Sequence, residues 1–437
     1  MKKFTIAALA VCLAFALAAP AMAVDADFTG AYRVRGSYVE HYDLLDTSPS
    51  HDYMDMRLRL QTVFKASDIL SVTMRLDALD NKRWGDADTA NTGAGNIDLD
   101  RVFMTIKAPI GKFDIGRMAG GTFGTTFVDS DSDYDRIKYT KVIDNLTLLA
   151  IYQKNAEKDY TTPIASGDGT VDSPYVYRDA ADQDSETYYL APIYKMENVT
   201  AGVLFGFTNN KVTADADAKS YLADPYFVAK FGPLAIQGEL FYKWGTTEYD
   251  STAADKDLKA LAYNLEASYS FGPASVMLGY AFASGQDPND TDTTGFGGVG
   301  NDWEKLFILT TNEVADLSGL GGVGNVSNDG IKKIKVAGYT DPGAKIIYGG
   351  VSFSPLDNLK LGLAVGYATA DQLPAGATQD DAGTEYDLTL NWKIYDNLTY
   401  TAIAAFLDAG DLYKQAVGND THFDDTYALF HQLQLTF

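Results

Sequence analysis

Residues 54–64 read MDMRLRLQTVF, and this stretch decides the fold class. Methionine and leucine occupy its alternate positions up to Leu60, while aspartate, arginine and glutamine fill the positions between. Side chains of a β-strand point alternately to opposite faces, so the pattern predicts a strand with one apolar and one polar face. The same alternation recurs in 70–77, 261–271 and 386–393. We therefore expect an all-β chain.

The expected strands are long, and the connections between them alternate in length. Segments of about 10 to 14 residues exceed the usual strands of soluble sheets and match a tilted crossing of a bilayer. Short turns on one rim and long polar loops on the other are typical of outer-membrane barrels. We predict a closed, transmembrane antiparallel β-barrel of about 16–18 strands. Long connections are expected at 41–51, 81–96, 118–133, 156–184, 210–219, 249–257, 284–343, 371–382 and 409–425.

The N-terminus has the organisation of a secretion signal. Two lysines precede an apolar run over 4–19, and residues 21–23 (AMA) supply the small residues of a cleavage site. We expect the signal peptide 1–23 to be removed, which leaves 24–437 as a single barrel domain; a retained membrane helix is the alternative. Cys12, inside the signal, is the only cysteine, so the mature chain would have no disulfides and no cysteine chemistry.

The composition narrows the class of protein. The chain has 437 residues with 35 basic and 59 acidic side chains, a net charge of −24. This acidic balance argues against a nucleic-acid binder and suits acidic loops that lie in water. Beyond the signal, no stretch reaches the roughly 18 consecutive apolar residues of a membrane helix. An outer-membrane barrel and a secreted soluble β-protein, such as an adhesin, remain.

Arginines gather on the polar faces of the first four expected strands. An arginine that faced lipid near the midplane would cost about 2–4 kcal/mol, so the alternation itself supports an inward direction. The alternative is that they are solvated positions on the outside of a soluble sheet. On the barrel interpretation six of them line one wall of the lumen: Arg33, Arg35, Arg57, Arg59, Arg75 and Arg101.

Residues 111–134 read GKFDIGRMAGGTFGTTFVDSDSDY, a short strand followed by small residues and an acidic cluster. We expect the connection 118–133 to fold into the lumen as a constriction loop. Its acidic side chains would face the arginines, and the field between the two walls would align dipolar solutes. Alternating acids can also bind calcium through oxygen ligands, or simply be solvated. The acidic residues are Asp129, Asp131 and Asp133.

The connection 284–343 is too long for a plain turn. It contains an apolar run, WEKLFIL, at 303–309. Because such a run favours packing over exposure to water, we expect this long extracellular loop to cover the pore mouth or to contact a neighbouring subunit.

Three features of the chain carry a family resemblance. The last strand, 427–437, alternates apolar residues and ends in Phe437, which resembles the signal read by the barrel-assembly machinery. Residues 111–117 (GKFDIGR) resemble the strand that leads into the third, constricting loop of trimeric porins, and a long connection follows directly. The chain is thus similar to the Gram-negative general porins.

This resemblance implies a location, an assembly and a function. A general porin would be a homotrimer in the Gram-negative outer membrane, in contact with membrane lipid and lipopolysaccharide. It would form a water-filled channel for passive diffusion of small hydrophilic solutes and ions, with no cofactor. The alternative within the same fold is a substrate-selective channel that uses the arginine ladder for anions such as sulfate or organic acids.

The histidines show no spacing typical of metal ligands. His431 points outward in mid-strand by the alternation, and a polar ring facing lipid is unfavourable. Gly30 and Gly36 lie on the outward face of the first strand, next to the last strand in a closed barrel. We expect these three residues at a subunit interface. A catalytic role for His431 is the alternative; no nucleophile accompanies it, so we do not expect an enzyme.

Overall fold

The computed structural model describes most of the chain beyond the expected signal. The signal itself, residues 1–23, lies outside the described residues. The described ranges are 25–42, 44–85, 97–130, 132–158, 183–213, 216–249, 254–297, 299–300, 302–310, 342–373, 377–417 and 422–437.

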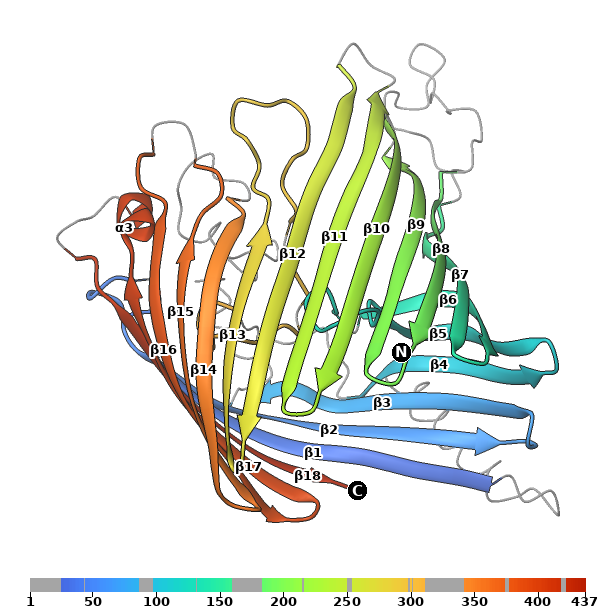
Figure 1. Ribbon diagram of the computed structural model, residues 1–437, viewed down its shortest axis with the longest axis horizontal. Coiled ribbons are helices and arrows are strands. Elements are labelled where there is room, and N and C mark those ends of the chain that lie inside the picture. The colour runs from blue at the N-terminus through green and yellow to red at the C-terminus, as the bar shows by residue number, and fades with distance from the viewer. Residues whose placement is uncertain are drawn as a thin grey trace, which may run out of the picture.

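Eighteen strands form one antiparallel sheet that closes on itself (Figure 1). Each strand pairs with its neighbours in the chain, and β1 also pairs with β18. Closure leaves no edge of unpaired backbone groups, as a sheet inside a bilayer requires. The predicted all-β barrel is confirmed, at the upper of the two strand numbers. The strands are β1 (Asp25–Glu40), β2 (His51–Lys65), β3 (Leu70–Arg83), β4 (Ile97–Ala108), β5 (Gly111–Gly120), β6 (Ser132–Ile143), β7 (Leu146–Ala156), β8 (Ser185–Lys195), β9 (Val199–Thr213), β10 (Ala216–Phe231), β11 (Leu234–Tyr249), β12 (Lys256–Phe271), β13 (Ala274–Ala283), β14 (Ala344–Leu356), β15 (Leu359–Thr369), β16 (Asp381–Tyr395), β17 (Leu398–Ala409) and β18 (Thr426–Thr436).

Short and long connections alternate around the barrel. Each even-numbered strand from β2 to β16 joins the next strand through two to four residues. The connections at the other rim are longer, with one exception. The prediction of a long connection at 210–219 was wrong, because β9 ends at Thr213 and β10 begins at Ala216. Both strands continue through polar sequence, which the alternation of apolar residues does not mark.

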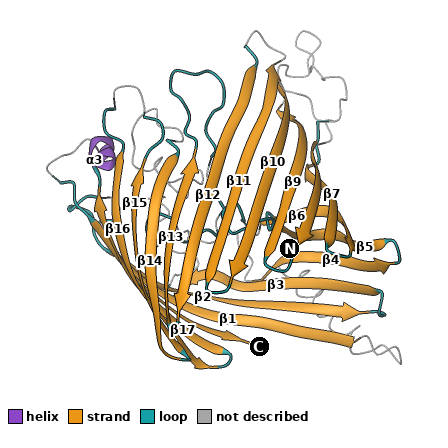
Figure 2. Ribbon diagram, viewed as in Figure 1, coloured by secondary structure: helices purple, strands orange, loops and turns teal. Residues whose placement is uncertain are grey.

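The outer surface of the barrel is apolar, and polar side chains point inward. Leu388 is 60% exposed, whereas its neighbour Asp387 is 3% exposed. This distribution inverts that of a soluble protein and is the one expected of a barrel surrounded by lipid. Strands make up most of the described structure (Figure 2).

Aromatic rings form a continuous row on the outer face of β7 to β11. Neighbouring ring centroids in this row lie 5.1–6.5 Å apart. Rings that are apolar in body and polar at the tip favour the boundary between lipid and water, so the row is typical of an interfacial girdle. Its members are Tyr152, Tyr188, Phe207, Tyr221 and Trp244.

The seam between β1 and β18 is closed by the last residue of the chain. Gly30 N–H donates to the Phe437 carbonyl at 2.7 Å, and Phe437 N–H donates to the Gly30 carbonyl at 3.0 Å. A Cβ on Gly30 would lie 2.6 Å from the Phe437 ring, and one on Gly36 would lie 2.2 Å from His431 Nε2. Both glycines therefore make room for rings of the last strand of the same barrel.

One short helix, α3 (Asp411–Val417), lies at the rim between β17 and β18. Its Leu412 and Tyr413 are buried against the apolar cluster inside the barrel. Within the described part of the chain, no helix is long and apolar enough to cross a membrane.

Gly30→Ala should weaken the seam. The new Cβ would also lie 2.7 Å from the Arg59 carbonyl oxygen, a backbone atom that cannot swing away. We expect a loss of about 1–3 kcal/mol in barrel stability, measured as a lower temperature for the mobility shift between folded and unfolded protein in detergent gels. Gly349→Ala is the matched control, because its nearest neighbour would be the Met277 carbonyl oxygen at 3.1 Å. Equal shifts for both variants would contradict the close approach at the seam.

Candidate functional site

Charged side chains from neighbouring strands pair on the inner face of the barrel. Arg35 of β1 donates two hydrogen bonds to Asp55 of β2, at 2.8 and 2.9 Å. Arg59 of β2 holds Asp77 of β3 in the same two-point geometry, at 2.7 and 2.5 Å. The planar fork of a guanidinium matches a carboxylate in this arrangement. Two ion pairs therefore cross the first three strands.

A β-bulge extends this series of ion pairs to β4. Arg75 is registered with Arg101 and Leu76 with Leu99, so Asp100 is an extra residue in β4. A bulge lets two consecutive residues reach one face of a sheet, and here Asp100 and Arg101 both point inward. Arg75 Nε donates to Asp100 Oδ2 at 3.0 Å.

Asp133 connects two of the predicted arginines. It lies near the start of β6, which begins at Ser132, rather than at the tip of a loop. Arg75 Nη2 donates to its Oδ2 at 3.2 Å, and Arg101 Nε donates to its Oδ1 at 2.5 Å. The structure thus brings one of the three predicted acidic residues directly against the arginines.

The other two acidic residues are placed differently. Asp129 belongs to the loop 121–130, and its backbone carbonyl accepts a hydrogen bond from Asp302 N–H at 3.1 Å. Asp131 lies outside the described residues. Among the residues that are described, no group of three histidine, cysteine, aspartate or glutamate side chains is placed to hold a metal ion.

Arg57 has a longer contact with a carboxylate. Arg33 and Arg57 are registered partners on β1 and β2, and Arg57 Nη1 lies 3.6 Å from Asp80 Oδ1. Arg59 Nη2 also approaches Asp100 Oδ2, at 3.8 Å. The six predicted arginines therefore share this face with five carboxylates. We name the set the arginine–aspartate wall: Arg33, Arg35, Asp55, Arg57, Arg59, Arg75, Asp77, Asp80, Asp100, Arg101 and Asp133.

The loop 121–130 crosses the lumen from β5 to the inner face of β10 and β11. Thr125 N–H donates to Glu239 Oε2 of β11 at 2.9 Å, and the Thr125 hydroxyl donates to the same oxygen. Phe123 packs edge-on against Tyr226 of β10, with ring centroids 5.0 Å apart. Because it is held on a wall several strands away, the loop occupies part of the channel cross-section.

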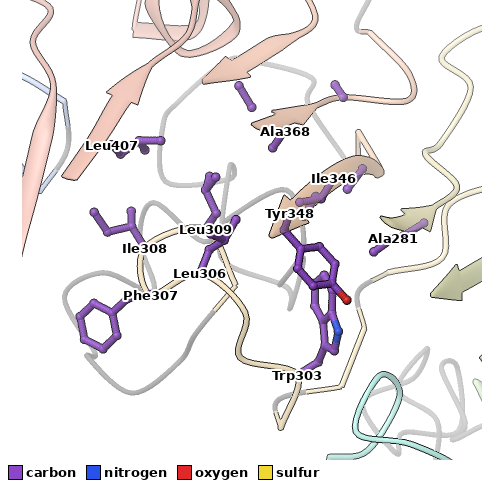
Figure 3. Close-up of a cluster of buried hydrophobic side chains, with 14 of the residues drawn as sticks. Ala281, Trp303, Leu306, Phe307, Ile308, Leu309, Ile346, Tyr348, Ala368 and Leu407 are labelled. Atoms are coloured by element: carbon purple, nitrogen blue, oxygen red, sulfur yellow. The ribbon is translucent and has the colours of Figure 1, made fainter. Parts of the chain in front are cut away.

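A second segment, 302–310, also lies inside the barrel. Figure 3 shows its side chains among residues of β13, β14, β15 and β17. Burial of such side chains stabilises a structure by about 1.5–3 kcal/mol each. This segment belongs to the connection 284–343, which we expected to cover the pore mouth or to contact a neighbouring subunit, and its residues 303–310 pack against the inner wall. Those with 1% exposure are Trp303, Leu306, Ile308, Leu309 and Thr310.

The two inserted segments contact each other. The Phe127 ring meets the Trp303 ring edge-on, with centroids 5.4 Å apart. Gly300 N–H donates to the Phe127 carbonyl at 2.8 Å. The loop 121–130 is therefore held on one side by Glu239 and on the other by the segment 302–310 and the residues just before it.

Comparison with known proteins identifies the family. A model of the Gram-negative porins matches residues 7–402, most of the chain. The chain belongs to the Gram-negative porin family. A comparison with curated proteins gave no match.

Solved structures share the porin fold. OccAB1 of Acinetobacter baumannii is 13% identical, with a TM-score of 0.55 over 94% of this chain and 96% of that one. OccK8 (OprE) of Pseudomonas aeruginosa is 13% identical, with a TM-score of 0.53 over 94% and 98%. The outer membrane protein opdK of Pseudomonas aeruginosa is 11% identical, with a TM-score of 0.51 over 94% and 99%. At such identities the likeness concerns the fold alone.

Family and fold establish the general function. The protein is an outer-membrane porin, a channel through which small solutes diffuse, and not an enzyme. The alternative of a secreted soluble β-protein is thereby excluded.

Sequence reasoning identified the arginines of this porin but not all of their partners. Asp55 and Asp77 alternate with the arginines on the same polar faces, so their pairing was visible in the pattern. Glu239 gave no such signal, because its partner is a loop more than a hundred residues away. The bulge that turns Asp100 inward also has no mark in the sequence.

Gly124→Ala should loosen the loop 121–130. Gly124 has a positive φ of 87°, and a Cβ there would lie 2.2 Å from Glu239 Oε1. We expect the loop to leave its anchor, seen as greater fluctuation of the open-channel current in planar bilayers. Gly297→Ala is the control, since its φ of 82° is similar but its Cβ would meet nothing within 4 Å. If the two variants fluctuate equally, the contact with Glu239 does not fix the loop.

Proposed function

We propose that solutes cross this porin between the arginine–aspartate wall and the loop 121–130, and that the passage is weakly selective. On this proposal the loop is the constriction, and small hydrophilic solutes of either charge pass it by diffusion. Selection by pore width and by lining charge is sufficient for such a channel, so no binding step is needed.

The charge balance of the wall carries this proposal. Asp133 accepts hydrogen bonds from both Arg75 and Arg101, and Asp55 accepts hydrogen bonds from Nε and Nη2 of Arg35. A guanidinium that already has a carboxylate partner offers little net attraction to a passing anion. The net charge of −24 belongs to the whole chain, and only charges near the narrow passage act strongly on a permeating ion.

A selective anion channel has less support. An entering sulfate or organic acid would have to displace an aspartate from a two-point contact such as that of Arg59 with Asp77. The displaced carboxylate would remain nearby and repel the anion. Four of the six arginines are therefore better described as members of ion pairs than as anion sites: Arg35, Arg59, Arg75 and Arg101.

Asp133→Asn should shift the ion selectivity toward anions. The substitution removes the charge that Arg75 and Arg101 share, so both guanidiniums would attract anions. We expect the anion-to-cation permeability ratio to rise by roughly twofold, measured from reversal potentials in a salt gradient. Asp135→Asn is the matched control: Asp135 lies two residues along β6 and is exposed, with its contact to Arg117 at 3.5 Å. An equal shift in both variants would place the selective passage elsewhere.

We also propose that the porin is a homotrimer with the seam of β1 and β18 at the subunit contact. His431 is exposed on the outer face, registered with Gly36 of β1 and Ala402 of β17. A polar ring exposed to hydrocarbon is costly, whereas a neighbouring subunit can shelter it and supply a hydrogen bond. Lipopolysaccharide around the trimer and recognition of Phe437 by the barrel-assembly machinery remain expectations of the same proposal.

His431→Leu distinguishes a subunit contact from a lipid contact. At an interface, loss of the polar contact should cost about 1 kcal/mol per subunit and lower the temperature at which oligomers dissociate in detergent. In lipid, leucine would be favourable and the barrel would be unchanged or more stable. His422→Leu, in the rim loop, serves as the control. Unchanged dissociation of the His431 variant would remove the proposed interface.

A further inference from the structure

One half of the inner wall differs from the other in chemistry. The inner faces of β1 to β4 carry charged side chains, as the arginine–aspartate wall shows. The inner faces of β12 to β18 carry small apolar residues that are buried, although the lumen of a porin is usually polar. We name this set the alanine bed: Ala260, Ala262, Ala281, Ala283, Ala344, Ala368, Ala405 and Ala428.

The segment 302–310 fills the bed. Trp303 meets the Tyr348 ring of β14 edge-on, with centroids 5.6 Å apart, and Figure 3 shows the two rings side by side. Phe307 packs against Phe430 of β18 at 5.3 Å. A Cβ on Gly366 of β15 would lie 2.3 Å from Leu306 Cδ1, so the wall has no space to spare under this side chain.

Two acidic residues of β16 hold the backbone of the segment. Ile308 N–H donates to Glu385 Oε1 at 2.5 Å, and Leu309 N–H donates to Glu385 Oε2 at 2.7 Å. Phe307 N–H donates to Asp387 Oδ2 at 3.0 Å. Three consecutive backbone donors are thus satisfied by two carboxylates that are nearly completely buried. Without these acceptors, three buried backbone donors would lack hydrogen-bond partners, which costs free energy.

We propose that the segment 302–310 is a fixed partition that closes the β12–β18 side of the lumen. It confines solutes to the side that carries the arginine–aspartate wall, and through Trp303 it also supports the loop 121–130. The alanine bed and the carboxylates of Glu385 and Asp387 are complementary to the segment in shape and in hydrogen bonding, which is the reason to regard it as permanent rather than mobile. This inference rests on the proposed passage along the charged wall and adds a second determinant of its width.

Glu385→Gln tests the partition by changing the side chain that accepts two of its backbone hydrogen bonds. The carboxylate accepts one N–H at each oxygen, so a glutamine must turn its own NH₂ toward one of the two donors. We expect the segment to leave the bed and the single-channel conductance to rise by roughly twofold. Glu248→Gln, an exposed side chain on β11, is the control and should conduct like the unmodified porin.

A disulfide between residues 306 and 366 supplies the second test. A Cβ on Gly366 would lie 3.1 Å from Leu306 Cγ, close to the spacing that a disulfide needs between Cβ and the partner sulfur. The only native cysteine is Cys12, in the expected signal, so Leu306→Cys with Gly366→Cys gives an unambiguous pair. Added to Glu385→Gln, the oxidised pair should return the conductance to the unmodified value, and reduction should raise it again.

The outcomes separate this inference from the proposed function. If Glu385→Gln folds and conducts like the Glu248→Gln control, the segment does not limit the channel. If the Glu385→Gln variant fails to fold, the cysteine pair in the otherwise unmodified porin decides. Equal conductance of its oxidised and reduced forms supports a fixed partition. A lower conductance of the oxidised form shows a mobile segment and overturns the proposal. A selectivity shift in Asp133→Asn alongside either negative result would leave the proposed passage intact.

Discussion

Every backbone N–H and C=O group in the hydrocarbon core of a bilayer must find a partner within the protein. A sheet meets this condition only when it closes, and here closure depends on the pairing of β1 with β18 from Ala31–Thr436 to Glu40–Tyr427. The terminal residue Phe437 adds the last two hydrogen bonds of the seam, to Gly30. The apolar outer surface and the polar lumen both follow from this closure, because each strand then has one face toward lipid and one toward water.

Charged side chains inside the barrel also need partners within the protein. A buried or half-buried guanidinium is stable only with a partner, since its desolvation is costly. The wall offsets this cost through ion pairs, such as those of Arg35 with Asp55 and of Arg59 with Asp77. The bulge at Asp100 extends this pairing to a fourth strand. On the proposed function, the same pairing that stabilises the wall would also make it weakly attractive to anions.

The sequence predicted the features that depend on the local alternation of apolar and polar residues. It did not predict contacts between residues that are far apart in the chain. Alternation in stretches such as 54–64 was sufficient for the barrel and for the inward direction of the arginines. The miss at 210–219 has a physical reason: β9 and β10 extend through polar sequence, where the apolar period gives no information. The burial of Trp303 was visible only as apolar composition in a loop, because its partners Phe127 and Tyr348 come from remote parts of the chain. The sequence predicts Asp133 in the connection 118–133 rather than in β6, because its place in the strand depends on pairing with β5.

We propose that a charge-balanced wall, not a ladder of free arginines, lines the passage. The reversal potential of the unmodified porin in a potassium chloride gradient tests it most directly, together with the dependence of current on salt concentration. We predict a reversal potential close to zero and a current that rises with salt without saturation. A potential near that of a chloride-selective channel, or saturation by sulfate or an organic acid, would contradict it.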